Sequence, residues 1–228
     1  MSEPYAVLVD VSKCTGCRGC QVACKQWNDL PAGRSVQTGT YQNPKSLNPT
    51  TWNLVLFNED FIERDGEKQV RSFFRLHKCM HCTEPVCLDV CPSQAIYRDE
   101  GTGAVVIDQE KCDGVGACVE ACPWDIPQLD VLNRKSTKCN FCIERIKDNK
   151  KPACVNTCVG NALTFGKRSE IYTMAEERLE KLKPKYPDAS VYGTDKDAFF
   201  GGLTDVYVLP EKPHYYGLEM PSMAGADA

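Results

Sequence analysis

The cysteines are the residues whose type and spacing carry chemistry in this chain. Fifteen of its 228 residues are cysteine, and all of them fall into four groups. Group one is CTGCRGCQVAC, group two is CMHCTEPVCLDVCP, group three is CDGVGACVEACP and group four is CNFCIERIKDNKKPACVNTC. Thiolates are ligands for soft metals, and an odd number of cysteines cannot be fully paired in disulfides. The cysteines therefore predict metal binding.

The spacing within the groups favours iron–sulfur clusters over zinc. Group one reads C-x2-C-x2-C-x3-C, the run in which bacterial ferredoxins bind one cluster with three thiolates and a second cluster with the fourth. Group three keeps this run except at Val115, and group two lengthens one interval. A zinc site instead needs two short cysteine pairs separated by a longer loop, which group four alone resembles.

The connection between groups two and three predicts which groups share clusters. Between Cys91 and Cys112 the chain has a Cys-Pro pair, a glycine-containing hairpin tip and a strand-like run, Val105–Asp108, as between the halves of a two-cluster ferredoxin. Groups two and three therefore form one module and, by elimination, groups one and four form the other. The predicted ligand sets are a first set of Cys14, Cys17, Cys20 and Cys158; a second set of Cys24, Cys139, Cys142 and Cys154; a third set of Cys79, Cys82, Cys87 and Cys122; and a fourth set of Cys91, Cys112 and Cys118, with Val115 at the vacant position.

Val115 leaves the sixteenth ligand position without a thiol. The corner of the cluster that it faces is either empty, which gives a 3Fe-4S cluster, or filled by hydroxide or by the carboxylate of Asp113 in an atypical 4Fe-4S cluster. Absence of the cluster is a third possibility, against which the three retained cysteines argue. We expect three 4Fe-4S clusters plus one 3Fe-4S or atypical 4Fe-4S cluster.

Other polar residues near the cysteines have less specific roles. A lysine precedes the leading cysteine of each group, at Lys13, Lys78, Lys111 and Lys138. These lysines either raise cluster potentials or keep the surface soluble, and the sequence leaves both readings open. His81 is expected to be a neighbour of a cluster and not a ligand, because group two already offers four thiols. His77 and His214 have no pattern of catalytic or metal-binding residues around them in the sequence. We expect no catalytic residue in this chain.

Two further segments are predicted to be regular structure. Strand-like runs at Trp52–Phe57 and Val70–Leu76 flank the turn signal Asp65-Gly66, which predicts a hairpin inserted after a loop rich in Pro, Gly, Asn and Thr. After group four, Ser169 is expected to cap a helix that ends at Pro184, with Ile171, Ala175, Leu179 and Leu182 as its apolar stripe. A short strand, Asp205–Leu209, and an extended arm bearing Pro and Tyr follow.

These elements predict an α+β fold of two ferredoxin-like β-α-β modules, each with two clusters. Residues 1–30 with 136–168 form module 1, residues 31–78 the loop and hairpin insertion, residues 79–135 module 2, and residues 169–228 the C-terminal helix and arm. The formal charge of −4, from 27 basic and 31 acidic residues, argues against nucleic-acid binding. No apolar run reaches the length of a membrane helix, and no N-terminal segment has the order of a secretory signal.

The order of the groups and the run PACVNTC-x-GNALTFG resemble the four-cluster ferredoxin-like subunit of the molybdopterin (dimethyl sulfoxide reductase) enzyme superfamily. The resemblance covers Val7 to about Lys167. Within the superfamily, CTGCRGCQVACKQWNDLP, TYQNP, ACPWDIPQLD and VYVLPEKPHYYGL are most similar to the β subunit of tungsten- or molybdenum-dependent formate dehydrogenases. The chain departs from the family at Val115 and lacks the C-terminal membrane helix of quinone-linked members.

The resemblance implies a non-catalytic subunit that passes electrons between a large Mo/W bis-pterin catalytic subunit and an external acceptor, such as a cytochrome, a ferredoxin or a membrane subunit. It also implies that module 1 faces the catalytic subunit, with the cluster of Cys14 nearest. The alternatives are the same role beside a pterin enzyme for an aldehyde, sulfur or arsenic substrate, or a free-standing polyferredoxin. Export together with a signal-bearing catalytic subunit and a cytoplasmic location both stay open.

Overall fold

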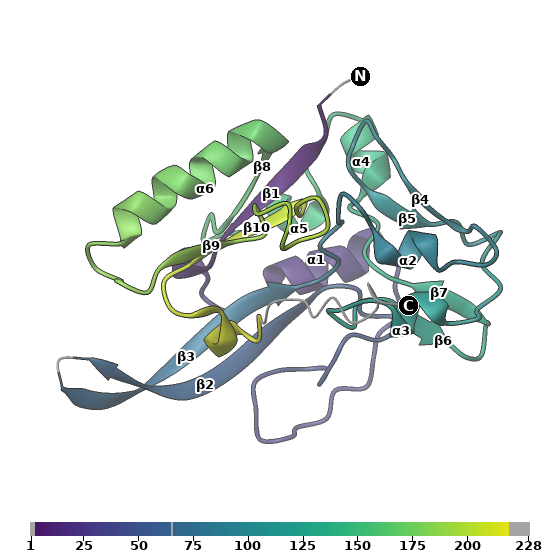
Figure 1. Cartoon of the computed structure of the whole chain (residues 1–228). Helices are drawn as coiled ribbons and strands as arrows, with labels where there is room; N and C mark the ends of the chain where they lie inside the picture. Colours follow the sequence, from purple (N-terminus) through teal and green to yellow (C-terminus); the bar gives the residue numbers. More distant parts are fainter. Residues whose placement is uncertain (1–2, 65, 219–228) are drawn as a thin grey trace.

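A four-stranded sheet joins the two ends of the chain. The computed structural model describes residues 3–64 and 66–218. Strand β1 (Tyr5–Asp10) pairs antiparallel with β8 (Leu163–Lys167) and parallel with β10 (Asp205–Leu209), and β10 pairs antiparallel with β9 (Ser190–Tyr192) (Figure 1). The strand order is therefore β8-β1-β10-β9, and β10 has the bounds that the sequence predicts.

Helix α6 (Arg168–Leu182) covers one face of this sheet (Figure 1). Side chains alternate between the two faces of a strand, so one strand contributes to two cores. The helix-side core contains Ala6, Leu8, Val206 and Val208 from the sheet and Ile171, Ala175 and Leu182 from the helix. The opposite side of β1 and β10, with Val7, Val9 and Tyr207, belongs to the larger core that includes residues of the cysteine groups.

The predicted helix cap at Ser169 is wrong. The N-cap of α6 is Lys167, and Ser169 lies inside the helix. The Lys167 N–H donates to the Glu170 carboxylate at 3.2 Å, and the Ser169 N–H donates to the Glu3 carboxylate at 2.7 Å. Two carboxylates thus satisfy the first amides of α6, in keeping with the preference of helix N-termini for negative charge.

The predicted hairpin is present and longer than its sequence signal. Strands β2 (Leu54–Arg64) and β3 (Glu67–His77) pair antiparallel along their whole length. The C-terminal segment packs on this hairpin through the short 3-10 helix η2 (Pro213–Tyr216), where the Tyr215 ring stacks on Phe73 at 4.9 Å. The arm therefore lies on the chain's own core as far as Leu218, and residues 219–228 lie outside the described part.

The remaining elements are short and carry or flank the cysteines. They are η1 (Val11–Lys13), α1 (Gly19–Trp27), α2 (Val86–Asp89), β4 (Ile96–Arg98), β5 (Val105–Ile107), α3 (Ala117–Glu120), β6 (Gln128–Asp130), β7 (Lys135–Thr137), α4 (Ile143–Lys147) and α5 (Ala153–Asn156). β4 pairs with β5, and β6 pairs with β7, each as a small antiparallel hairpin. The chain is thus a small α+β fold in which loops, more than long elements, place the thiols.

The long loop before the hairpin lies along α1. Arg18 donates to the Tyr41 carbonyl and Gln21 to the Asn43 carbonyl, both at 2.8 Å, and Lys25 donates to the Thr50 carbonyl at 2.6 Å. Side chains of one helix thus hold a loop that has almost no secondary structure of its own. Among the described residues, no helix has the length and apolar character needed to span a membrane.

Candidate metal centres

The first set of thiols gathers at the start of α1. Cys14, Cys17 and Cys20 line one pocket together with Cys158, which follows α5. Burial raises the pKa of Cys20 to about 12, and burial also raises the pKa of Cys14. The rest of the wall is mostly apolar and includes Phe74. Cys17 is the exposed member, so this set reaches the protein surface.

The second set lies deeper. Its four thiols, Cys24, Cys139, Cys142 and Cys154, come from α1, from the loop before α4 and from α5, and all four residues are buried. Each thiol interacts electrostatically with others of the set. Burial raises the pKa of Cys139 to about 12. The backbone N–H of Phe141 donates to the Cys139 sulfur at 3.4 Å.

The third set has a similar arrangement of interacting thiols. Cys82 interacts with each of the other three thiols of its set, which are Cys79, Cys87 and Cys122. Burial raises the pKa of Cys87 to about 12 and that of Cys122 to about 11. The backbone N–H of His81 donates to the Cys79 sulfur at 3.4 Å, matching the bond from Phe141 to Cys139. Groups two and four therefore place their leading cysteines in the same local geometry.

The fourth set contains three thiols and an open position. Cys91, Cys112 and Cys118 line a pocket that also includes Val115. Val115 is 65 % exposed, and Asp113 is exposed as well. The N–H groups of Ala95 and Ser136 donate to the sulfurs of Cys91 and Cys112, each at 3.3 Å. Burial raises the pKa of Cys118, and the Ser136 hydroxyl opposes that rise.

The four sets follow one another in a row. The first and second sets meet where Cys20 and Cys24 lie one helical turn apart on α1, and these two thiols interact. The second and third meet at Cys139 and Cys79, and the third and fourth meet at Cys87 and Cys118. The row therefore begins at exposed Cys17, crosses the buried interior, and ends at exposed Val115.

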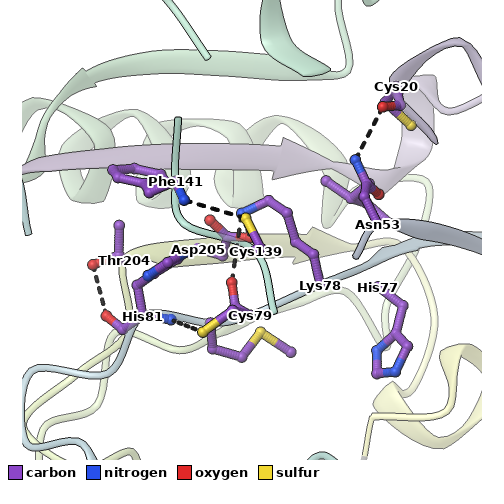
Figure 2. Close-up of polar contacts among 12 residues, drawn as sticks. Cys20, Asn53, His77, Lys78, Cys79, His81, Cys139, Phe141, Thr204 and Asp205 are labelled. Atoms are coloured by element: carbon purple, nitrogen blue, oxygen red, sulfur yellow. Dashed lines mark hydrogen bonds and ion pairs between the residues drawn. The ribbon is translucent and has the colours of Figure 1, made fainter. Parts of the chain in front are cut away.

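The four lysines that precede the leading cysteines occupy two kinds of environment. Lys13 and Lys111 are exposed, whereas Lys78 and Lys138 are buried. The Lys78 ammonium lies 2.5 Å from the Asp205 carboxylate, among the residues drawn in Figure 2. Burial alone lowers the pKa of Lys78, but Asp205 and neighbouring thiols raise it well above its usual value. Asp205 was not among the residues predicted from the sequence, because nothing in its own strand marks it as a partner of group two.

His81 is the histidine that lies beside a thiol set in the described residues. His81 is fully buried beside the third set, and its Nδ1 accepts the Val105 N–H at 3.0 Å. That acceptor role places the ring proton on Nε2, which has no hydrogen-bond partner in the described residues. Burial and the adjacent Arg75 lower the pKa of His77 to about 3, so its ring is neutral. The His214 ring lies 4.1 Å from the Tyr215 ring in the C-terminal segment, at a tilt of 41°.

The donor groups fit iron–sulfur clusters. All fifteen cysteines are free thiols, all but Cys17 are buried or partly buried, and backbone N–H groups point at several sulfurs. Buried thiolates need compensating positive charge or hydrogen bonds, which bound iron, lysines and amides supply. Across residues 3–64 and 66–218, no three or more His, Cys, Asp or Glu side chains are grouped as a site for one metal ion.

Several proteins of known function are similar to this chain. Residues 70–168 match the family model of the 4Fe-4S dicluster domain. The chain is 38 % identical to the beta chain of formate dehydrogenase 2 (cytochrome c-553) of Nitratidesulfovibrio vulgaris, over 93 % of this chain and 97 % of that protein. It is 37 % identical to the formate dehydrogenase-O iron-sulfur subunit of Escherichia coli, over 95 % of this chain and 71 % of that protein. A tetrathionate reductase subunit of Salmonella typhimurium is 33 % identical, over 90 % of this chain and 75 % of its own length.

Proposed function

The chain belongs to the family of formate dehydrogenase iron–sulfur (β) subunits, and from this premise we propose that it carries electrons between a formate-oxidising Mo/W bis-pterin subunit and an external acceptor. The subunits of this family are electron-transfer components and not the catalytic chains of their complexes. The observation that carries the proposal is the row of four thiol sets, exposed at both ends and buried in the middle.

We assign one iron–sulfur cluster to each thiol set. The first three sets each offer four thiols and suit a 4Fe-4S cluster, while the fourth set offers three and suits a 3Fe-4S cluster. Such clusters supply one-electron storage, and the chain supplies spacing, burial and hydrogen bonds to sulfur. An atypical 4Fe-4S cluster in the fourth set requires a further ligand, and Asp113 is the carboxylate nearest to it in sequence.

We further propose the two-module division of the chain. Module 1 combines residues 1–30 and 136–168, which contribute β1, α1, α4, α5 and β8, and its helices α1 and α5 contact each other. Module 2 spans residues 79–135, with the β4–β5 hairpin and the contacting helices α2 and α3. Residues 31–78 and 169–228 are the inserted loop and hairpin and the C-terminal cover.

The direction of electron flow follows from the family resemblance. The first set, with exposed Cys17, faces the catalytic subunit in this proposal, and the fourth set, with exposed Val115, faces the acceptor. A cytochrome, a ferredoxin or a membrane subunit would serve as that acceptor. The N. vulgaris relative carries cytochrome c-553 in its name, which supports a cytochrome.

Co-production with its catalytic subunit tests the proposal. Formate added to the anaerobic complex should reduce the clusters of this chain, followed by electron paramagnetic resonance (EPR). The chain alone, with clusters in place, should respond to dithionite and not to formate. A complex in which formate leaves these clusters oxidised, or in which the acceptor is reduced equally fast without this chain, would overturn it.

One alternative substrate has a specific observation in its favour. The tetrathionate reductase relative is 33 % identical to this chain, so the same kind of subunit could serve an enzyme of sulfur oxyanions. In that case tetrathionate should oxidise the reduced clusters in the native complex, whereas formate should not reduce them. A free-standing polyferredoxin would instead elute as a monomer with all clusters present.

A further inference from the structure

The junction between the second and third sets contains two buried lysines that cross between the modules. Lys78 precedes Cys79 of the third set, yet its ammonium lies 5.5 Å from the centre of the Phe141 ring, and the Phe141 N–H donates to the Cys139 sulfur of the second set. Lys138 precedes Cys139 of the second set, yet it donates to the Val105 carbonyl, and the Val105 N–H donates to His81, which lies between Cys79 and Cys82 of the third set in the sequence. Each lysine therefore places its ammonium beside residues of the other module.

The two lysines differ in their partners. The Lys78 ammonium pairs with the Asp205 carboxylate at 2.5 Å, and both side chains are almost completely buried, at 1 % and 0 % exposed. Asp205 opens strand β10, and its carboxylate has no hydrogen-bonding partner besides Lys78 in the described residues. Lys138 donates to the carbonyls of Val105 and Cys139, and within residues 3–64 and 66–218 no carboxylate pairs with it.

This difference matters because charge acts strongly in a buried site. A nearby positive charge favours the reduced, more negative state of a cluster and so raises its reduction potential. Asp205 and Lys78 together carry no net charge, so the pair acts more weakly at a distance than an unpaired lysine does. The charge of Lys138 is opposed only by the carbonyl groups that accept its hydrogen bonds among the described residues.

We propose that Lys138 raises the reduction potential of the cluster in the third set, whereas Asp205 holds that of the second set down by neutralising Lys78. The step from the second to the third cluster is then energetically downhill for an electron that enters at the first set. This inference rests on the proposed electron-transfer function, but it concerns potentials within this chain and does not depend on the substrate.

EPR-monitored redox titration of the complex with its clusters in place tests the proposal. Asp205→Asn keeps the side-chain shape and removes the negative charge, so the second cluster should become easier to reduce. We expect at least a tenfold change in its reduction equilibrium constant, which corresponds to about 59 mV for one electron. Lys138→Met should make the third cluster harder to reduce. Cys142→Ser and Cys122→Ser variants, each altering one ligand, identify which signal belongs to which set.

Matched variants distinguish an effect of the lysine charge on the clusters from an effect of the substitution on folding. Lys13→Met and Lys111→Met change the same Lys-Cys motif at exposed positions, where solvent screens the charge, and should shift no central cluster by more than twofold. Lys78→Met combined with Asp205→Asn removes both charges and should bring the second cluster back close to its original potential. Iron content measured beside each titration shows whether the clusters are retained.

Each outcome supports or overturns the proposal. If Asp205→Asn leaves both central clusters unchanged or makes the second harder to reduce, the proposal is wrong. If Asp205→Asn also loses iron, the test passes to Lys138→Met. An unchanged reduction potential of the third cluster in that variant overturns the proposal. Shifts of the expected sign in a complex whose clusters formate does not reduce would retain this inference and reject the proposed catalytic partner.

Discussion

The loops that carry the first and fourth sets share two left-handed backbone positions and a helix start, and they differ at the residue between those two positions. Gly16 and Gly114 have φ of 65° and 70°, and Arg18 and Gly116 are also left-handed, at 61° and 88°. A helix begins at the next residue in both loops, α1 at Gly19 and α3 at Ala117. Between them lies Cys17 in one loop and Val115 in the other, both exposed. Val115, at the proposed vacant ligand position, therefore differs from Cys17 in its side chain and not in the conformation of the flanking residues.

The two loops differ more in what supports them. Gly16 rests against the rings of Phe57 and Phe74 from the hairpin, which lie 3.1 to 3.2 Å from the position that a Cβ atom would take. Gly114 rests directly on the backbone of Arg134, in the turn between β6 and β7. Side chains therefore support the loop of the first set, whereas backbone supports the loop of the fourth set. The loop of the fourth set should tolerate substitution less well, because backbone moves less readily than side chains.

The largest expected effect is that of Val115→Cys. Because the backbone already matches that of the first set, the new thiol should complete the fourth site and convert a 3Fe-4S cluster into a 4Fe-4S cluster. The oxidised protein should lose its 3Fe-4S EPR signal and gain one iron per chain. Val70→Cys, at an exposed hairpin position, should change neither quantity. Wild-type protein without a 3Fe-4S signal in the oxidised state would contradict the assignment.

The reciprocal change is Cys17→Val. It should turn the first set into a copy of the fourth, with a second 3Fe-4S signal in the oxidised protein and a raised potential at that site. An electron held there passes on less readily, so formate-dependent reduction of the other clusters should slow. Stopped-flow spectroscopy of the complex measures that rate, with Val115→Cys as the control that leaves the first set intact. An unchanged rate would show that electrons do not enter through the first set.

The next effect comes from Gly114→Ala. A methyl group there overlaps the Arg134 backbone, in addition to the left-handed strain of about 1–2 kcal/mol that any L residue has. We expect the variant to lose the fourth cluster, measured as a decrease of three irons per chain, and to keep the other clusters. Gly16→Ala carries the same strain but meets only side chains, so it should lower thermal stability and retain all clusters. Equal iron loss in both variants would contradict the proposed difference in support.

Cysteine spacing predicts which thiols within one group act together because their geometry is local, whereas the assignment of each set's fourth member to a distant group stays a prediction. The hairpin was predictable because its β-branched and aromatic residues and its turn signal lie within one segment. Spacing did not predict that two of four identical Lys-Cys pairs would be buried, or that Asp205 would face Lys78. The position of Asp205 depends on the pairing of β10 with β1 and on the contact of its N–H with the Met80 carbonyl, and Lys138 is buried against the Val105 carbonyl of β5. Each is a contact between distant segments for which neither segment carries a signal.

The smallest expected effect is that of Ser136→Ala at the fourth set. The Ser136 hydroxyl is buried, belongs to a residue that lines the pocket of the fourth set, and has no hydrogen-bond partner in the described residues. It is therefore available to donate to a sulfur of the bound cluster, which favours the more negative, reduced state, so its removal should lower the potential of the fourth cluster. One net hydrogen bond of about 1 kcal/mol corresponds to a shift on the order of 40 mV for one electron. Ser190→Ala, in β9 and outside every set, should shift nothing. A fourth-cluster potential unchanged by Ser136→Ala would mean that exposure at Val115, and not hydrogen bonding from β7, sets the difference between the two ends of the row.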